Sequence, residues 1–346
     1  MLYIIDTCTD PQWNLAAEEY LLKEFREPIF RLWRNDNAII VGQYQNTLAE
    51  IDIDYVKKNG IKVVRRLTGG GAVFHDLGNL NFTFIEDKTP GEDAAAMFRR
   101  FTRPILTALN SLGIEAYLEG RNDLLIDGRK FSGNAVCIHK NRILQHGTLL
   151  FSASMTDLSS ALKSRPEKFT GKAVQSNRSR VTNISEHLSH NPLYPDGKMD
   201  IGAFKDYLGN YICCKYPDLT PYIYTPEDKA AITKLRDEKY ALDSWNFGKS
   251  PAYSYSKVHK FPGGLLEVFM DVEKGIITRL EIMGDYFFTK PTEEFIRAFT
   301  GVKHTHGTVA EKLAELDRQI KAEGNPLGLQ AYFSNITTHE ILSMFF

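Results

Sequence analysis

Three consecutive glycines, Gly69 to Gly71, lie between two β-rich segments, and this feature restricts the fold more than any other. Residues 61–67 are rich in β-branched side chains, and residues 79–87 alternate between apolar and polar side chains, as is typical of a half-buried strand. Glycine allows positive φ and a close approach of backbone N–H groups, which together can form an anion-binding concavity. The flanking strands argue against a flexible linker, so the sequence predicts either a ligand-binding loop or a structural bulge in a hairpin.

The glycine run matches neither of the two common nucleotide-binding fingerprints. A P-loop requires the pattern G-x-x-x-x-G-K-[ST]. Residues 248–250 supply its last three positions, but Asp243 stands where its first glycine should be. The dinucleotide pattern G-x-G-x-x-G begins at Gly69, but Phe74 occupies its third glycine position. A nucleotide at this loop would therefore be held in a different way.

Strand-like and helical segments alternate along the chain, and hairpin signals join most of the strands. Asp127-Gly128 is a strong signal for a two-residue hairpin. This pattern predicts an α+β fold rather than a doubly wound parallel sheet. The chain has 346 residues, and a segment that contains Gly, Ser and Pro near 245–250 precedes a second β pattern at 265–288. We predict two domains, residues 1–245 and residues 246–346.

Composition excludes several classes of protein. The net charge of −1 gives no general reason to expect a nucleic-acid or membrane partner. The four cysteines show no C-x-x-C spacing, which argues against a structural zinc site and favours a reduced, cytoplasmic protein. The N-terminal residues lack the features of a signal peptide, and no stretch approaches ~18 consecutive apolar residues, so we predict no membrane span.

Charged residues lie on both sides of the glycines. Arg65 and Arg66 would point to opposite faces of a regular strand, so at most one of them reaches a site at the loop. His75 and Asp76 are interpreted as a turn-forming pair rather than a catalytic dyad, because no nucleophile can be assigned to them.

A lysine lies in the second candidate segment, residues 120–136. A regular strand after the hairpin turn places Lys130, Ser132 and Asn134 on one face. This face is either a ligand-binding surface or an ordinary solvated face of the sheet. His146, in the returning strand, taken alone indicates only a structural histidine.

The third candidate segment, residues 165–186, is long, polar and basic. Loops of this length without evident secondary structure are either functional or disordered. Two interpretations stay open, namely a lid over a phosphate-bearing ligand and a surface insertion.

Five motifs occur in one characteristic order: RRLTGGGAVFHDLGN (65–79), GRNDLLIDGRKFSGNA (120–135), HGTLL (146–150), RSRVTN (178–183) and WNFG (245–248). In this order they resemble the lipoate–protein ligase A family, and the resemblance covers nearly the whole chain. It implies a mixed-sheet catalytic domain of the biotin/lipoate ligase type, followed by a small α/β accessory domain. It also implies ATP, Mg²⁺ and lipoate as ligands, with lipoyl-AMP as the intermediate. The implied acceptors are a lysine on lipoyl domains of 2-oxoacid dehydrogenase complexes and on the glycine-cleavage H protein.

The resemblance also implies roles for individual residues. Lys130 is the implied catalytic residue, because the family's lysine contacts both the lipoyl carbonyl and the phosphate. Asp123 is a candidate ligand of the metal, and the loop at 165–183 would cover the adenylate. The residues implied to bind lipoate or nucleotide are Arg66, Gly70, Gly71, Ala72, Val73, Phe74, Asn122, Asp123, Lys130, Ser132, Gly133, His146 and Arg178.

Three rival functions remain. An octanoyl- or lipoyl-transferase of the same fold would use a cysteine nucleophile without ATP. Cys137 is the candidate, although strand parity places it on the face opposite Lys130, and some relatives carry arginine there. A non-catalytic lipoate- or nucleotide-binding protein would release no pyrophosphate. A biotin ligase is disfavoured, because residues 65–74 lack the arginine-rich glycine loop typical of that family.

Overall fold

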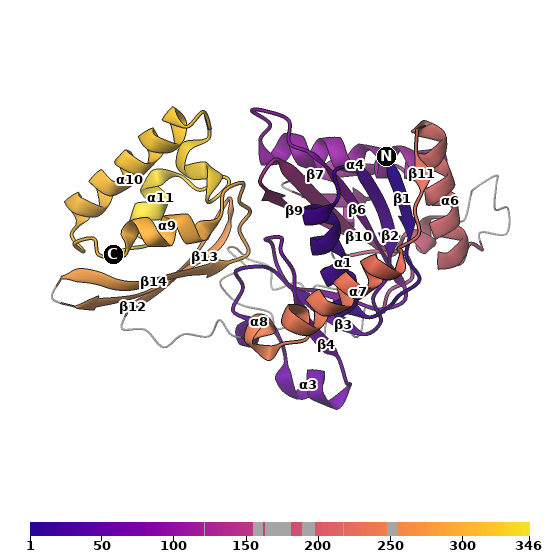
Figure 1. Cartoon of the computed structure of the whole chain (residues 1–346), viewed down its shortest axis with the longest axis horizontal. Coiled ribbons are helices and arrows are strands. Elements are labelled where there is room, and N and C mark those ends of the chain that lie inside the picture. The colour runs from indigo at the N-terminus through magenta and orange to yellow at the C-terminus, as the bar shows by residue number, and fades with distance from the viewer. Residues whose placement is uncertain are drawn as a thin grey trace.

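The structure is a computed structural model. It describes residues 1–120, 122–154, 162, 181–188, 198–216, 218–247, 255–273 and 275–346. Its described part forms a main body around a large mixed sheet and a smaller C-terminal part around a three-stranded sheet (Figure 1).

The main sheet has eight strands in the order β11-β1-β2-β6-β10-β9-β8-β7. Strand β1 pairs in parallel with β2 and β11, and the other neighbours are antiparallel, so the sheet is mixed. The α+β prediction is confirmed. The strands are β1 Leu2–Ile5, β2 Ile29–Trp33, β6 Asn79–Asp87, β7 Ala116–Glu119, β8 Asp123–Ile126, β9 Arg129–His139, β10 Arg142–Leu150 and β11 Thr220–Pro221.

Helices cover both faces of this sheet. On one face α4 (Ala94–Ser111) and α6 (Ile201–Lys215) bury an aromatic core that includes Phe82 and Phe84. On the other face α1 (Pro11–Glu24) and α7 (Pro226–Leu235) pack over Trp33 and Leu144. Helix α1 begins where the Asp10 carboxylate accepts a hydrogen bond from the backbone N–H of Gln12, with Pro11 in the first turn. A turn of π-helix (Arg236–Tyr240) continues α7.

The glycine run belongs to a separate three-stranded sheet in the order β4-β3-β5. It connects β4 (Lys62–Arg65) to β5 (Val73–His75) across the end of β3 (Ala38–Val41). Short helices flank this sheet, namely α2 (Thr47–Glu50), α3 (Ile53–Lys58) and α8 (Asp243–Asn246). The remaining short element of the main body is η3 (Ile184–His187).

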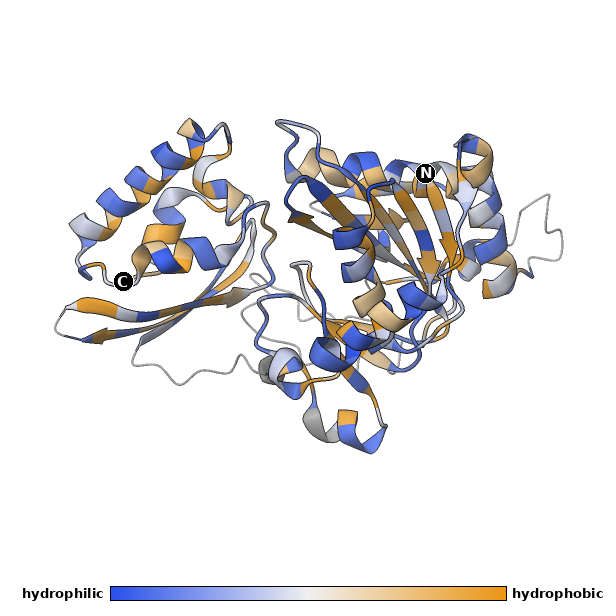
Figure 2. Cartoon of the chain, in the orientation of Figure 1, coloured by the Kyte–Doolittle hydropathy of each residue, from blue (hydrophilic) through white to orange (hydrophobic). Residues whose placement is uncertain are grey.

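The C-terminal part has a hydrophobic core of its own. Strands β12 (Tyr255–Phe261), β13 (Gly264–Glu273) and β14 (Ile276–Gly284) form an antiparallel meander. Its helices are α9 (Thr292–Phe299), α10 (His306–Ala322), η5 (Gly328–Ala331) and α11 (Thr338–Ser343). Figure 2 shows hydrophobic strands in the main sheet and mostly hydrophilic residues on the visible side of α10. The predicted boundary near 245–250 adjoins residues 248–254, which lie outside the described residues, so it stays a prediction.

The end of β14 and the segment that follows it pack against the main body. The backbone N–H of Gly284 donates to the carbonyl of Tyr44, and the rings of Tyr44 and Tyr286 stack with their centroids 5.5 Å apart. The Phe287 ring meets the edge of Phe98 of α4, with centroids 5.2 Å apart. The C-terminal part therefore reaches the core of the main body. Among the described residues, no helix is long and apolar enough to cross a lipid bilayer.

Candidate active site

The floor of the candidate site consists of two rows of side chains that cross the main sheet on the face covered by α1. The first row runs through Trp33, Asn81, Thr148, Gly133 and Asp123. The second row, displaced by two residues along each strand, runs through Arg31, Thr83, His146 and Ala135. Directly paired residues share a face, so side chains from five strands meet on one surface.

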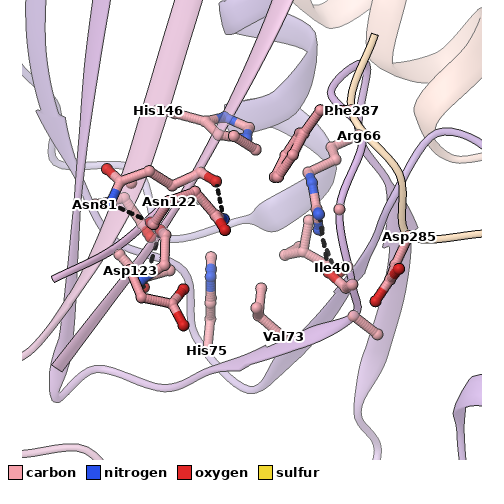
Figure 3. Close-up of a pocket in the computed structure, with 18 of the residues that line it drawn as sticks. Ile40, Arg66, Val73, His75, Asn81, Asn122, Asp123, His146, Asp285 and Phe287 are labelled. Atoms are coloured by element: carbon pink, nitrogen blue, oxygen red, sulfur yellow. Dashed lines mark hydrogen bonds between the residues drawn. The ribbon is translucent and has the colours of Figure 1, made fainter. Parts of the chain in front are cut away.

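A cavity of about 240 Å³ lies above this floor. The glycine loop lines it together with Leu15 of α1 and with Asp285 and Phe287 from the C-terminal part. Figure 3 shows Phe287 beside Arg66. We call this cavity the inner cavity. Apolar side chains such as Ile40 and Val73 line it together with polar groups of the main sheet.

A second cavity of about 750 Å³, here called the outer cavity, adjoins the inner one. Lys130, Asn122, Asp123, Ala72 and Val73 line both of them. The Lys130 ammonium lies 2.7 Å from a carboxylate oxygen of Asp123, and both side chains are more than one-third exposed. Lys130 therefore stands at the border of the two cavities with a counter-ion beside it.

A register shift between β8 and β9 determines which way Lys130 points. Leu124 pairs with Ser132 and Leu125 with Lys130, so Phe131 has no partner on β8. The extra residue reverses the alternation and brings Lys130 to the face of Gly133 and Ala135. The predicted common face of Lys130, Ser132 and Asn134 is therefore wrong. Strand parity also predicted that Cys137 lies on the face opposite Lys130, and that prediction is wrong for the same reason.

The two arginines before the glycines have separate roles. Arg65 is fully buried and lines neither cavity, because its guanidinium donates to the carbonyls of Gly42, Gln43 and Gln45. Arg66 lines the inner cavity, so one of the two arginines reaches the site, and it is the one that the family resemblance implies. Its guanidinium donates to the carbonyl oxygens of Ile40, Gly69 and Gly71.

These hydrogen bonds from Arg66 therefore stabilise the conformation of the glycine loop. Burial lowers the pKa of its guanidinium to about 10. The side chain consequently stays charged at neutral pH, although it is almost completely enclosed.

Both ring nitrogens of His146 lie within hydrogen-bond distance of a neighbouring side chain. Its Nδ1 lies 2.9 Å from a carboxylate oxygen of Glu18, and its Nε2 lies 2.8 Å from Oγ1 of Thr68. Burial alone would raise the pKa of Glu18, but its interactions with His146 and Arg31 outweigh burial and hold the pKa below its ordinary value. The site therefore contains a buried carboxylate that the sequence analysis did not identify.

The structure brings most of the predicted residues together. Phe74 and Ser132 line the outer cavity only, and Arg178 lies outside the described residues, as does most of the loop at 165–183. Glu18, Trp33, Asn81, Asp285 and Phe287 were not predicted. The predicted residues that line the inner cavity are Arg66, Gly70, Gly71, Ala72, Val73, Asn122, Asp123, Lys130, Gly133 and His146.

Comparison with known proteins places this site in a family. Residues 10–212 match the lipoyl protein ligase A/B catalytic domain, and residues 250–345 match the bacterial lipoate protein ligase C-terminus. A lipoate-protein ligase of Bacillus subtilis is 39% identical over 351 residues, covering 100% of both chains.

Solved structures agree with these family and sequence matches. P. falciparum LipL1 in complex with lipoate has a TM-score of 0.74 at 26% identity, over 95% of this chain and 99% of that chain. A lipoate-protein ligase A bound with ATP has a TM-score of 0.60 at 29% identity, over 71% of this chain and 98% of that chain. A bipartite lipoate protein ligase from Thermoplasma acidophilum, described with its E2 lipoyl domain, has a TM-score of 0.62 at 31% identity, over 73% and 98%. These matches confirm the resemblance predicted from the five sequence motifs. The chain therefore belongs to the lipoate–protein ligase family.

Proposed function

We propose that this chain joins lipoate to a lysine of an acceptor protein in two steps, and that both steps take place where the inner and outer cavities meet. The observation that carries the proposal is the position of Lys130, whose side chain lines both cavities. The inner cavity, with its partly apolar wall, receives the lipoyl group. The larger outer cavity receives ATP.

In the first step a carboxylate oxygen of lipoate attacks the α-phosphate of ATP. A new O–P bond forms, the bond to the β-phosphate oxygen breaks, and pyrophosphate leaves. Two anions must approach each other, so a cation between them stabilises the transition state. Lys130 fits this role, because its ammonium can contact the carboxylate on one side and the phosphate on the other. The backbone N–H groups from Gly70 to Val73 would hold the acyl-phosphate.

Mg²⁺ is part of the proposal as a ligand of the triphosphate. Among the described residues, no group of three His, Cys, Asp or Glu side chains could hold a metal ion by itself. Mg²⁺ commonly binds through one or two carboxylates together with substrate phosphates, and Asp123 supplies one carboxylate at the outer cavity. The donor set therefore fits Mg²⁺ that arrives with ATP. When bound, the ion would neutralise charge on the phosphate oxygens.

In the second step the acceptor lysine attacks the acyl carbonyl, an amide bond forms and AMP leaves. The acceptor must approach through the outer cavity, whose lining includes Glu119, Gly120 and Pro262. The proposed acceptors are lipoyl domains of 2-oxoacid dehydrogenase complexes and the glycine-cleavage H protein. We also propose that residues 1–245 form the catalytic domain and residues 246–346 an accessory domain, from which Asp285 and Phe287 reach the inner cavity.

An omission assay tests the reaction. The complete mixture contains the protein, ATP, Mg²⁺, lipoate and a purified acceptor domain, and the mass of the acceptor is measured. We expect the mass increase of one lipoyl group only in the complete mixture, and pyrophosphate release without the acceptor. Lipoylation that proceeds without ATP would contradict the proposed adenylation step.

Replacing Cys137 separates this reaction from a cysteine-dependent transfer. Cys137 is buried beneath α1 and lines neither cavity. Burial raises the pKa of its thiol, which opposes formation of the nucleophilic thiolate. A Cys137→Ala variant is therefore expected to keep ATP-dependent lipoylation within about twofold of the parent, as measured by acceptor mass over time. Complete loss of transfer in a folded variant would favour the transferase.

A further inference from the structure

His75 presents an unpaired nitrogen to the inner cavity. The side chain is 3% exposed and lines the cavity, and its ring points into it (Figure 3). Its Nε2 has no hydrogen-bond partner among the residues that the structure describes. Asn81 lines the same cavity, and its amide nitrogen also lacks a partner among those residues, whereas its Oδ1 accepts from Asn79. Buried polar atoms are nearly always paired, so these atoms point to a ligand group.

A buried chain of hydrogen bonds determines which nitrogen of His75 carries the hydrogen. The Arg31 guanidinium, paired with Asp6, donates to Oδ1 of Asn14 at 2.6 Å. Nδ2 of Asn14 donates to Oδ1 of Asn35 at 3.0 Å, and Nδ2 of Asn35 lies 3.1 Å from Nδ1 of His75. Each amide therefore turns its oxygen toward Arg31 and its nitrogen toward His75. Nδ1 of His75 must accept, which leaves the hydrogen on Nε2.

The ring is neutral at physiological pH. Burial lowers the pKa of His75 to about 3, and the nearby Arg66 guanidinium acts in the same direction. His75 therefore offers one N–H donor to the inner cavity.

The position of this donor matches the far end of the acyl chain. Lys130 lies next to Gly133, whereas the His75 ring lies next to Trp33, with centroids 6.4 Å apart. Three strand spacings separate Trp33 from Gly133 in the first row of the floor, which is about 14 Å. When Lys130 holds the carboxylate of an eight-carbon acyl chain, the other end of that chain therefore lies near His75. In lipoate this end is a dithiolane ring with two sulfur atoms, and in octanoate it is a methyl group.

We infer that His75 determines acyl specificity, because its Nε2–H donates to a dithiolane sulfur and is left unpaired beside an alkyl tail. The inference rests on the proposed placement of the lipoyl group in the inner cavity. Sulfur is a weak acceptor, so the expected advantage of lipoate over octanoate from this contact is about 5- to 20-fold.

The test compares pyrophosphate release with lipoate and with octanoate. In a His75→Phe variant we expect kcat/KM for lipoate to fall by about 5- to 20-fold and kcat/KM for octanoate to stay constant or rise. His75→Gln is the matched control, because its amide N–H can replace the donor and should restore much of the preference. Equal losses with both substrates would show a merely structural role and overturn the inference.

Two further measurements keep the inference distinct from the proposed function. In the parent protein, imidazole ¹⁵N shifts should report His75 as the Nε2–H form, and the opposite tautomer would overturn the inference whatever the variants do. An Ala135→Met variant narrows the inner cavity and should weaken both acyl substrates. If that variant binds both normally, the proposed location of the acyl group fails, and the inference fails with it.

Discussion

Replacement of Lys130 by alanine is expected to reduce lipoyl-AMP formation by a factor on the order of 10²–10³. Lys130 lines both cavities, and in the proposed reaction its ammonium contacts the lipoate carboxylate and the α-phosphate together. Removing it leaves two anions to react without the cation between them, and it leaves Asp123 without its counter-ion. Release of pyrophosphate from ATP and lipoate, without acceptor protein, measures this step directly.

Arg129→Ala is the matched control for Lys130→Ala. Arg129 is the preceding cation on the same strand, with a side chain that is 41% exposed, lines neither cavity and lies 3.7 Å from Glu186. Its replacement removes the same formal charge from the protein surface and should leave pyrophosphate release nearly unchanged, since exposed ion pairs contribute little. Near-normal release by the Lys130 variant, or an equal loss in both variants, would contradict the role assigned to Lys130.

Local sequence signals predicted much of the frame around the site. Asp127 and Gly128 both have positive φ and form the two-residue turn between β8 and β9, as the dipeptide predicts. The alternating segment 79–87 coincides with β6. The opposite faces of a strand also predicted that at most one of the two arginines reaches the site, and Arg66 lines the inner cavity whereas Arg65 is buried elsewhere. In each case the residues that determine the feature lie within a few positions of one another in the sequence.

Features that depend on distant segments were not predictable in this way. The unpaired Phe131 reverses the face of Lys130, and only the pairing of β9 with β8 reveals it. Glu18 reads as an ordinary polar residue of a helix, yet the main sheet buries it against His146. Phe287 lies more than 200 residues from the glycines in sequence, and its presence in the inner cavity follows from packing between the two parts of the chain. Glu18 lies three residues after Leu15 and four before Leu22, on the same side of the helix as both leucines, and this spacing was the one local signal that could have identified it.

Gly69→Ala is expected to disrupt the packing between the glycine loop and the C-terminal part. A Cβ at this position would lie 2.4 Å from the backbone carbonyl oxygen of Tyr286. Backbone cannot rotate away as a side chain can, so one of the two segments must shift, at a cost of about 1–3 kcal/mol. We expect a lower free energy of unfolding in urea and weaker lipoate binding, because Gly70 and Phe287 beside this contact line the inner cavity.

Gly71→Ala provides the contrast, because the three glycines are required for different reasons. Gly70 has φ of +89°, which strains any other residue, whereas Gly71 has ordinary φ and a Cβ there would find its nearest atom, Oδ2 of Asp285, at 4.0 Å. Nothing in the described part of the fold requires a glycine at position 71, so the missing side chain leaves space for the ligand. Gly71→Ala should therefore keep the unfolding free energy of the parent while weakening lipoate and ATP binding. Equal destabilisation by Gly69→Ala and Gly71→Ala would contradict this division, and the whole run would then serve the packing of the C-terminal part.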